Sequence, residues 1–441
     1  MSFSCFLRRI NPLGDGLVDS YVSGLSKTPE QLTAMNTSYD PALNDIPKAR
    51  SPLVNSGAYA GNNTYSTQQE LKFVVSGEDK PISPKTEIVI GILPGEGVGA
   101  EVISCSLKVL DAVSGVTGLS VKIREGGVIG RQAECICGTC LPEDVVAFCR
   151  NVFEEGGAIL NGPGGGRYVY DLRKQLGLFF KASPLIPANG VIEASRLKPE
   201  WIRNLDIIVT RENDGGIYQG EWSSESDSGD GRLSRHTFQY TEGQVRRFLE
   251  VSARIAQSRR GEMAIVWKEF GIPSISKLWK DCAAEIASKH DVQYTMIDID
   301  LMAYRLIHEP SCFDVIATPN LFGDVIADLG ATLIGSRGIS FSGNFSPKGD
   351  AVYQTNHGAA YPLAGKDQAN PAGQIFSLAM MLRESFGLRS EAWIMEEAVR
   401  SVWKEGYGTF DVDSPGRIVV GTREFGNRVA ERAEAIARTH S

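Results

Sequence analysis

The residues that point most clearly to chemistry are two aspartates four positions apart, Asp324 and Asp328, in the run NLFGDVIADLG. On a helix this spacing places both carboxylates on one face, one turn apart. Like charges so placed repel each other unless a cation lies between them. A solvated acidic face is the usual reason for such a pair, but the apolar neighbours Val325, Ile326 and Ala327 leave little solvated surface around it. The pattern therefore favours oxygen ligands for a hard divalent ion.

The segment around these aspartates predicts a buried strand that turns into a helix. Residues 313–318 are apolar and partly β-branched, and a Pro-Asn-Leu-Phe-Gly sequence ends the strand before helical spacing begins. The same reasoning predicts strands over 87–93, 206–210 and 263–267 and a helix over 242–258. Residues 221–234, which are rich in Ser, Asp and Gly, are expected to form an exposed connection.

Composition and charge are those expected of a soluble enzyme. A chain of 441 residues, 42% hydrophobic and 22% charged, can bury a large core and should hold more than one domain. Its net charge of −8, without a basic block, argues against nucleic acid as a partner. No apolar run approaches the ~20 residues that span a bilayer, so a membrane is not expected either. Eight cysteines are too few for a disulfide scaffold at this length, which indicates a reducing compartment.

The N-terminal fifth of the chain differs from the rest. Residues 1–85 are rich in Ser, Asn, Gly, Pro and Thr and have weak periodicity, which predicts a poorly ordered extension. The opening MSFSCFLRRINPLG carries two arginines and no acid before Asp15, a pattern that weakly resembles an organelle transit peptide. We expect a cytoplasmic protein, with a mitochondrial or plastid location as the alternative.

Two further motifs admit more than one interpretation. Cys135, Cys137 and Cys140 have a spacing that suits zinc or an iron–sulfur cluster, yet no histidine or second cysteine pair is near, which favours an ordinary loop and helix. Gly95-Glu96-Gly97 follows a predicted strand, as in dinucleotide-binding turns. The acid expected about 20 residues later is absent, so this motif alone does not assign a dinucleotide site.

Four segments together resemble one enzyme family. NLFGDVIAD (320–328), LRKQLGLF (172–179), RENDGGIYQG (211–220) and HGAAYPLAGK (357–366) closely resemble sequences of the isocitrate/isopropylmalate family of metal-dependent β-decarboxylating dehydrogenases. The resemblance covers roughly residues 86–441. It implies an α/β fold of the isopropylmalate dehydrogenase type with two domains. A discontinuous larger domain that binds the cofactor, residues 86–178 and 336–441, would flank an inserted substrate and dimerisation domain, residues 179–335.

The resemblance also implies which residues hold the metal and transfer protons. Asp324 and Asp328 would bind Mg²⁺ or Mn²⁺ together with Asp298, which a neighbouring subunit contributes. Lys268, likewise lent across a dimer, would remove the proton of the substrate hydroxyl, with a pKa lowered by burial near other cations. Tyr218 would protonate the enol carbon after decarboxylation.

The implied substrate-binding residues depart from the family at one position. Arg173 and Arg211 match family arginines whose planar guanidinium grips a substrate carboxylate bidentately. Ser183 stands where the family has another such arginine, so one of three carboxylate-binding cations is absent. Lys181, or Arg167 in the loop where relatives contact the variable part of the substrate, would restore the charge in a new place. We expect the second anionic group of the substrate to meet Arg167.

The segment 357–366 resembles the cofactor loop of the family. Its glycine would let the backbone approach the adenosine, and the ANP sequence at 369–371 would contact the adenine edge. NAD-using members carry an acid at the position of Pro362 and NADP-using members a lysine, so the sequence leaves NAD or NADP open. The residues implied to line the coenzyme are His357, Gly358, Ala359 and Asn370.

These resemblances imply metal-dependent oxidative decarboxylation of a malate-like 2-hydroxy diacid with hydride transfer to NAD or NADP. The enzyme would be a homodimer or a hetero-oligomer with a paralogue. Departures at Ser183, Phe270, Gln354 and Pro362 favour an alternative, a catalytically impaired paralogue that acts as a regulatory subunit or scaffold. The presence of every assigned metal and proton-transfer residue favours the enzyme.

Overall fold

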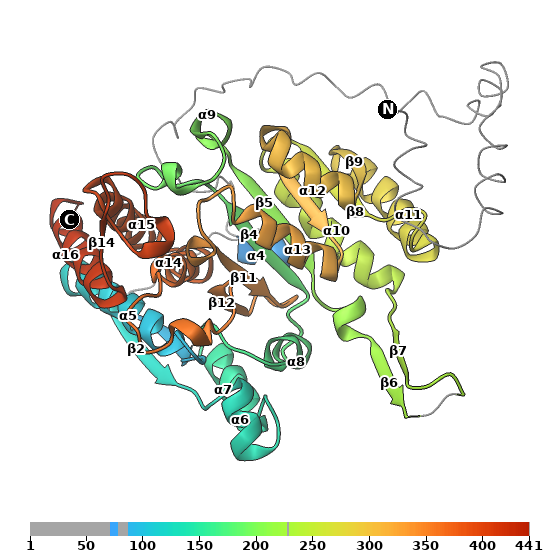
Figure 1. The fold of residues 1–441 in the computed structure, drawn as a ribbon, viewed down its shortest axis with the longest axis horizontal. Coiled ribbons are helices and arrows are strands. Elements are labelled where there is room, and N and C mark those ends of the chain that lie inside the picture. The colour runs from blue at the N-terminus through green and yellow to red at the C-terminus, as the bar shows by residue number, and fades with distance from the viewer. Residues whose placement is uncertain (1–70, 78–86, 227–228, 441) are drawn as a thin grey trace, which may run out of the picture. The chain divides into compact units, whose positions relative to one another are not determined.

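A ten-stranded sheet runs through the described part of the chain (Figure 1). The computed structural model describes residues 71–77, 87–226 and 229–440. The strand order is β2–β1–β3–β12–β11–β4–β5–β10–β8–β9. In chain order the strands are β1 (Glu87–Leu93), β2 (Ser120–Glu125), β3 (Ala158–Asn161), β4 (Phe180–Leu185), β5 (Ile207–Glu212), β8 (Glu262–Trp267), β9 (Gln293–Asp298), β10 (Val315–Thr318), β11 (Phe341–Phe345) and β12 (Ala351–Thr355).

The sheet consists of two parallel sets of strands joined through β11 and β4. β2, β1, β3 and β12 pair in parallel, and so do β5, β10, β8 and β9. The three pairings between the sets, β12–β11, β11–β4 and β4–β5, are antiparallel, so the two sets run in opposite directions. The predicted strands over 87–93, 206–210, 263–267 and 313–318 are all confirmed, with ends that differ by up to two residues.

Helices follow most strands, which completes the predicted α/β fold. α14 is buried over its whole length and packs on β11, β12 and α5. No helix among the described residues is long and apolar enough to cross a membrane. The longer helices are α5 (Gly99–Thr117), α6 (Gly130–Cys137), α7 (Glu143–Glu154), α8 (Tyr168–Gln175), α10 (Glu242–Gln257), α11 (Pro273–His290), α12 (Ile299–His308), α13 (Asn320–Gly330), α14 (Ala372–Phe386), α15 (Arg389–Lys404) and α16 (Thr422–His440).

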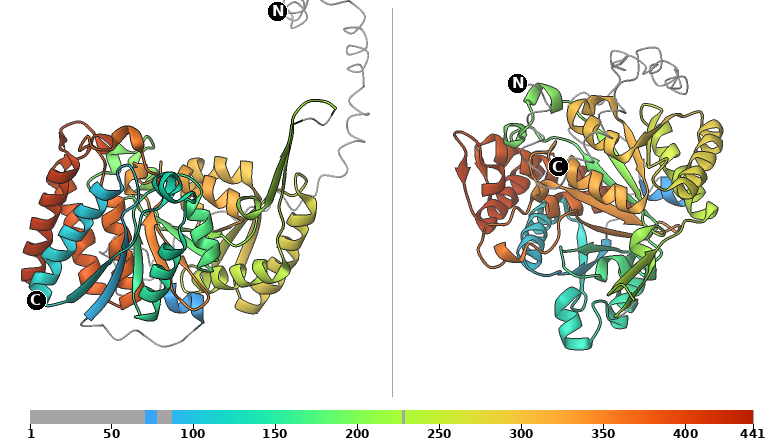
Figure 2. Two further views of the ribbon diagram at one scale, coloured as in Figure 1. Left: turned by 90° about the horizontal axis from the view of Figure 1, so that it is seen from below. Right: turned by 45° about the vertical axis from the view of Figure 1, so that its right-hand side comes forward.

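A separate antiparallel hairpin projects away from the large sheet (Figure 2). It consists of β6 (Glu221–Glu225) and β7 (Leu233–Thr237), and nearly all of these residues are exposed. The exposure predicted for 221–234 is therefore confirmed, but part of this stretch forms strands and not an irregular connection. Trp222 stacks on His236 across the hairpin, with 5.7 Å between ring centroids, and this cross-strand contact stabilises the pairing.

One short helix corrects the predicted N-terminal extension. The prediction of poor order over residues 1–85 is wrong for α4 (Leu71–Ser76), because Leu71, Val74 and Val75 are buried in the main core. Apolar residues at i, i+3 and i+4 form one face of a helix, and the average composition of 85 residues hides so short a pattern. The remainder of the extension, including its transit-peptide-like start, lies outside the described residues, so the cytoplasmic location remains a prediction.

The predicted domain boundaries fall within a continuous sheet. β4 belongs to the predicted inserted domain, 179–335, and β11 to the second part of the predicted larger domain, 336–441. These two strands pair directly, from Phe180 opposite Phe345 to Ala182 opposite Gly343. The division into two domains remains a prediction, with its boundary at the β4–β11 pairing.

Candidate active site

The two aspartates of the NLFGDVIAD run lie on α13, which begins directly after β10. Asp324 and Asp328 are one helical turn apart, as predicted. Gly323 sets the position of the helix, because a Cβ there would lie 2.8 Å from the Cβ of Arg211 and 2.2 Å from the Thr318 hydroxyl. The glycine therefore lets the first turn of α13 pack directly against the end of β5.

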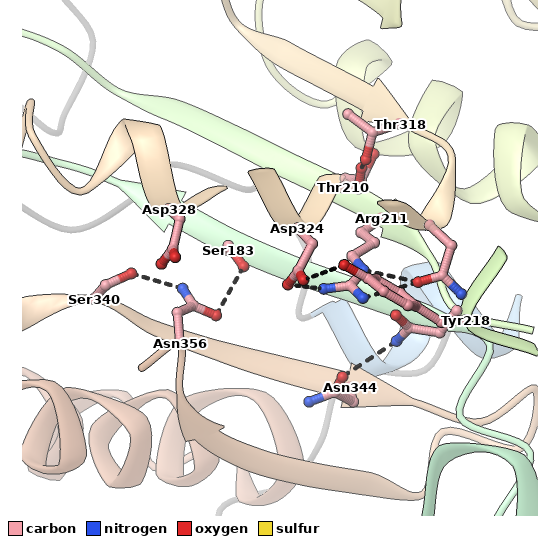
Figure 3. A network of polar contacts seen from close by, with 12 residues as sticks. Ser183, Thr210, Arg211, Tyr218, Thr318, Asp324, Asp328, Ser340, Asn344 and Asn356 are labelled. Carbon is pink, nitrogen blue, oxygen red and sulfur yellow. Dashed lines mark hydrogen bonds and ion pairs between the residues drawn. The ribbon is translucent and has the colours of Figure 1, made fainter. Parts of the chain in front are cut away.

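Asp324 is held by two donors (Figure 3). Arg211 Nη1 donates to its Oδ1 at 2.5 Å, and the Tyr218 hydroxyl donates to its Oδ2 at 2.9 Å. Burial alone would raise the pKa of the Asp324 carboxyl. Arg211, Lys181 and the Tyr218 hydroxyl outweigh burial, and the pKa lies below its usual value. Asp324 is therefore a stable carboxylate in the site.

Arg211 is fixed at the end of β5 by a second network. It is 3% exposed, and its Nε and Nη2 donate to Asn320 Oδ1 at 3.1 and 2.8 Å. Asn320 Nδ2 in turn donates to the Gly215 carbonyl at 2.7 Å. These bonds join the end of β5, the loop that follows it and the first turn of α13 into one rigid unit.

Tyr218 keeps its proton beside Asp324. Burial, followed by the Asp324 charge, raises the pKa of the phenol, so the hydroxyl remains a donor. The ring of Tyr170 lies 4.7 Å from the Tyr218 ring between centroids, and Arg167 Nη2 donates to the Tyr218 carbonyl at 2.9 Å. Arg167 also lies over the Trp222 ring, 4.4 Å from its centroid. The structure thus places Arg167 against the tyrosine, and its contact with a substrate remains a prediction.

Three buried cations, Arg173, Lys181 and Arg211, form what we call the cation cluster. Arg173 lies in the last turn of α8, and Lys181 lies on β4 directly opposite Arg211 on β5. Burial and then Arg211 lower the pKa of Arg173 to about 9. Burial and then the two arginines lower the pKa of Lys181 well below its usual value. Among the described residues, Arg211 is the one member of this cluster that pairs with a carboxylate.

At Ser183, where the family has an arginine, neutral side chains form a small hydrogen-bond network (Figure 3). Ser183 Oγ donates to Asn356 Oδ1 at 3.4 Å, and Asn356 Nδ2 donates to Ser340 Oγ at 2.7 Å. Asp328, the second aspartate of α13, is bonded by both Nε and Nη2 of Arg337, at 3.1 and 2.8 Å. Sequence reasoning did not identify Arg337, because nothing in its local sequence links it to an aspartate nine residues earlier.

Lys268 and Asp298 lie together. Lys268 Nζ pairs with Asp298 at 3.2 Å and with Asp300 at 2.6 Å. These carboxylates, Asp300 first, raise the pKa of Lys268, so the lowered pKa expected from burial near cations is wrong for a single chain. No three His, Cys, Asp or Glu side chains of the described residues converge as a metal site. One chain therefore assembles Asp324 and Asp328 without Asp298, and its contribution by a second subunit remains a prediction.

The carboxylates on α13 fit a hard divalent ion. Asp324 and Asp328 offer oxygen ligands from one face of one helix, the donor chemistry that Mg²⁺ and Mn²⁺ prefer. In this structure Asp324 pairs with Arg211 and Asp328 pairs with Arg337. These ion pairs offset the repulsion between the two carboxylates. A metal ion at this position would therefore share or displace two arginines.

The closely spaced cysteines do not form a metal site among the described residues. Cys135 and Cys137 are exposed on α6, and Cys140 Sγ donates to Asp171 Oδ2 at 3.6 Å. Side chains two residues apart on a helix point to different sides, so these thiols cannot converge on one ion. The segment thus forms a helix that ends at Cys137 and a loop that contains Cys140, and metal binding by these thiols remains untested.

The loop predicted to bind the cofactor packs on the turn after β1. The Val98 N–H donates to the Ala359 carbonyl at 2.9 Å. Gly97 allows this approach, because its φ is +59° and a Cβ there would lie 2.0 Å from the same carbonyl oxygen. His357 Nδ1 lies 2.9 Å from the Gly358 carbonyl, and Gly358 is exposed. Three of the predicted coenzyme residues therefore share one loop held by backbone contacts.

Asn370, the fourth predicted coenzyme residue, serves the fold in this structure. Its Oδ1 accepts from the Ala372 N–H at 3.0 Å at the start of α14, and its Nδ2 donates to Asp411 at 3.1 Å. Both ends of its amide are thus engaged. Its contact with an adenine edge remains a prediction.

A contact that sequence reasoning missed joins the cofactor loop to the rest of the site. The Tyr361 hydroxyl donates to Glu96 Oε2 at 2.9 Å, and Glu96 also accepts from the N–H groups of Gln132 and Gly165 at 2.7 and 3.0 Å. Burial would raise the pKa of Glu96, but these bonds lower it below the usual value. Glu96 and Tyr361 lie 265 positions apart, so no local pattern predicts their meeting.

Comparison with known proteins agrees with this geometry. A family model described as isocitrate/isopropylmalate dehydrogenase matches residues 89–429, most of the chain. The chain belongs to the isocitrate/isopropylmalate dehydrogenase family. Members of this family are decarboxylating dehydrogenases that use a divalent metal ion, Mg²⁺ or Mn²⁺, and NAD or NADP. The resemblance and the α/β fold inferred from the sequence are confirmed.

Individual members of the family show how far the likeness extends. The 3-isopropylmalate dehydrogenases of Heyndrickxia coagulans and Aquifex aeolicus are 35% and 34% identical to this chain, covering 78% and 79% of it and 96% and 97% of their own lengths. The crystal structure of isocitrate dehydrogenase from Methylococcus capsulatus has a TM-score of 0.70 at 27% identity, covering 79% of this chain and 99% of that one. These relatives are named for different substrates, so membership of the family gives the reaction class and leaves the substrate open.

Proposed function

We propose that this protein catalyses the metal-dependent oxidative decarboxylation of a malate-like 2-hydroxy diacid, with hydride transfer to NAD or NADP. The observation that carries the proposal is the cation cluster beside Asp324 and Tyr218. Buried cations need anionic partners, and the single carboxylate of Asp324 does not balance three of them. A substrate with two carboxylates would supply the remaining charge.

The cation cluster would bind the substrate, and the aspartates on α13 and Lys268 would assist its oxidation. Arg173 and Arg211 would bind one carboxylate and orient the carbon that carries the hydroxyl toward the nicotinamide. A metal ion held by Asp324 and Asp328 would supply Lewis-acid stabilisation of negative charge on substrate oxygens. As hydride leaves that carbon for the nicotinamide, the hydroxyl proton would pass to solvent, with the neutral form of Lys268 from a second copy of the chain as the base that relays it.

Decarboxylation would depend on Tyr218. Loss of CO₂ from the resulting 2-oxo acid leaves the bonding electron pair on the adjacent carbon as an enolate. The Tyr218 hydroxyl would donate its proton to that carbon, and solvent would then reprotonate the phenol. The raised pKa keeps the phenol protonated until this step, and Arg167, bonded to the Tyr218 carbonyl, would position it.

We also propose that the site is completed by a second subunit, either another copy or a paralogue, bound through the segment 179–335. α12 and α13 contact each other and expose the large apolar side chains Leu301, Tyr304 and Val325, which are 49%, 60% and 50% exposed. Exposed apolar groups gathered on neighbouring helices are typical of protein interfaces. Asp298 immediately precedes α12, so such an interface would lie next to the third predicted metal ligand.

The proposed reaction has two measurable products, reduced coenzyme and CO₂. Full-length protein incubated with Mn²⁺, either coenzyme and a malate-like acid should form reduced coenzyme and CO₂ in equal amounts, and omission of Mn²⁺ should abolish both. Formation of reduced coenzyme without CO₂ would contradict the decarboxylation step. Absence of both products with every 2-hydroxy diacid would contradict the enzymatic proposal.

A second candidate is a catalytically impaired paralogue that acts as a regulatory subunit or scaffold. Phe270, two residues after Lys268, is 88% exposed, and an aromatic ring in solvent suits a protein contact better than proton transfer. Changes at Ser183, Gln354 and Pro362 point the same way. Turnover that appears only after an active paralogue is added, and that responds to Phe270→Ser, would favour this candidate.

A further inference from the structure

We propose that Lys181 is a carboxylate-binding group of the active site, so that the charge absent at Ser183 is carried two residues earlier on the same strand. The inference rests on the proposed function in one respect, since the carboxylate is taken to be the substrate's. Lys181 and Ser183 lie on one face of β4, because side chains alternate between the faces of a strand. The charge is therefore displaced along that face by about 7 Å.

The placement of β4 buries almost all of Lys181. β4 pairs with β5 on one side and β11 on the other, where Lys181 lies opposite Arg211 and Asn344 respectively. The residue is 4% exposed, and no hydrogen bond or ion pair joins its amine to another described residue. An ammonium group with three donors is stable in such a place only with an acceptor, since burial of an unpaired charge is unfavourable.

The guanidinium of Arg173 also has a donor without a partner among the described residues. Arg173 is 5% exposed, and its Nε is buried without a hydrogen-bond partner among the described residues. Asp324, the nearest fixed carboxylate, is already bonded by Arg211 and Tyr218. Both cations have lowered pKa values for the same physical reasons, burial and mutual repulsion. A carboxylate that enters beside Arg173 and Lys181 would satisfy both and remove the repulsion between them.

The position of Lys181 also indicates the class of anion. Lysine presents a point charge with rotatable donors, where arginine presents a planar fork. Lys181 and Arg211 are direct cross-strand neighbours, with Cα atoms about 5 Å apart, which suits carboxylates separated by one or two carbons. Farther along the strand, Ser183 and Asn356 offer neutral hydrogen-bonding groups that suit a hydroxyl. The geometry thus fits a short hydroxylated dicarboxylate.

Binding of malonate to the metal-free full-length protein tests this inference without any turnover. Malonate has two carboxylates one carbon apart and no hydroxyl to oxidise. Isothermal titration calorimetry should show that Lys181→Met weakens malonate binding by about tenfold or more, because a charge-assisted hydrogen bond is lost. Lys181→Arg, which keeps the charge, should bind malonate more tightly than Lys181→Met. Lys174→Met, at an exposed lysine on α8, should bind it as the unaltered protein does.

Thermal unfolding gives a second readout that guards against a folding defect. Malonate should raise the Tm of the unaltered protein and not that of Lys181→Met, while Lys181→Met alone should be at least as stable as the unaltered protein, because it removes an unpaired buried charge. If Lys181→Met does not fold, Lys181→Gln replaces it in both measurements.

Two results would overturn the inference: equal malonate affinity of the unaltered protein and Lys181→Met, or no binding by the unaltered protein at millimolar concentrations. Failure of the proposed function looks different. In that case malonate binding would still depend on Lys181, but no 2-hydroxy diacid would reduce either coenzyme.

Discussion

The proposed substrate side and the proposed coenzyme side of this molecule are built from different kinds of contact. On the substrate side, side chains contact one another: the Arg211 guanidinium and the neutral Tyr218 hydroxyl both donate to the Asp324 carboxylate. On the coenzyme side, a backbone contact from the Val98 N–H to the Ala359 carbonyl joins the loop to the turn after β1, beside the side-chain bond from Tyr361 to Glu96. A side-chain site depends on the identity of each residue, whereas a backbone site depends on shape and on a few glycines.

The chain departs from its family on both proposed sides, but with different expected consequences. Ser183 stands where the family has an arginine, and we propose that Lys181 on the same strand face supplies the charge that the substrate needs. In the predicted cofactor loop, Pro362 stands where family members carry an acid or a lysine, while Gly97 allows the close backbone approach. We therefore expect substitutions on the substrate side to have large effects on activity, and those on the coenzyme side to have small ones.

The largest effect is expected for Tyr218→Phe. Removal of the phenolic proton donor should lower kcat by about 100-fold or more, the usual contribution of a general acid. Tyr170→Phe is the matched control, because its ring lies 4.7 Å from that of Tyr218 and its hydroxyl has no assigned role. Rates of CO₂ release measure both variants. Equal losses in the two would show that the pair acts through packing.

Asp324→Asn should have the next largest effect. It removes one charge from the pair on α13 and should weaken Mg²⁺ or Mn²⁺ binding by about tenfold or more while the fold stays intact. Calorimetric titration of the ion measures the change, and Asp281→Asn on the exposed face of α11 is the control. An unchanged affinity for the ion would exclude the proposed metal site.

Glu96→Gln tests the coenzyme side and should have the smallest effect. Loss of charge-assisted bonds from Tyr361 and two backbone N–H groups should cost about 1–2 kcal/mol of stability. The folded-state pKa of Glu96 lies below its ordinary value of 4.5, so its stabilisation is complete above that value and is lost as pH falls through the lowered pKa. The difference in Tm from the unaltered protein should therefore be present at neutral pH and shrink in acid. A difference that does not change with pH would exclude the charge as its cause.

Local patterns predicted the elements that carry the site better than the contacts between them. The i, i+4 spacing of Asp324 and Asp328 and the strands that precede the active loops could be inferred because each depends on a few neighbouring residues. The pairing of Asp328 with Arg337 requires the chain after α13 to turn back, and no short window contains that information. Likewise α4 was hidden because three apolar residues do not alter the composition of a long polar segment.

The pKa of Lys268 was predicted in the wrong direction for a related reason. The sequence shows that Asp298 and Asp300 exist but not that both reach Lys268 across the β8–β9 pairing. A lysine between two acids is stabilised as a cation, whereas a lysine among arginines is not. Lys181 on β4 is such a lysine among arginines, and its pKa is lowered. It lies two residues before Ser183, where the family resemblance implies a charge.

The most direct test of the account transfers the positive charge from position 181 to position 183 of β4 by a double substitution. Rates of coenzyme reduction would be compared for a malate-like acid, isocitrate and 3-isopropylmalate, using the unaltered protein and the double variant Lys181→Asn, Ser183→Arg. The account predicts that the unaltered protein prefers the short diacid, and that the exchange shifts the rate ratio toward the larger acids by about tenfold or more. Preference of the unaltered protein for isocitrate or 3-isopropylmalate, with a ratio that the exchange leaves unchanged, would contradict it.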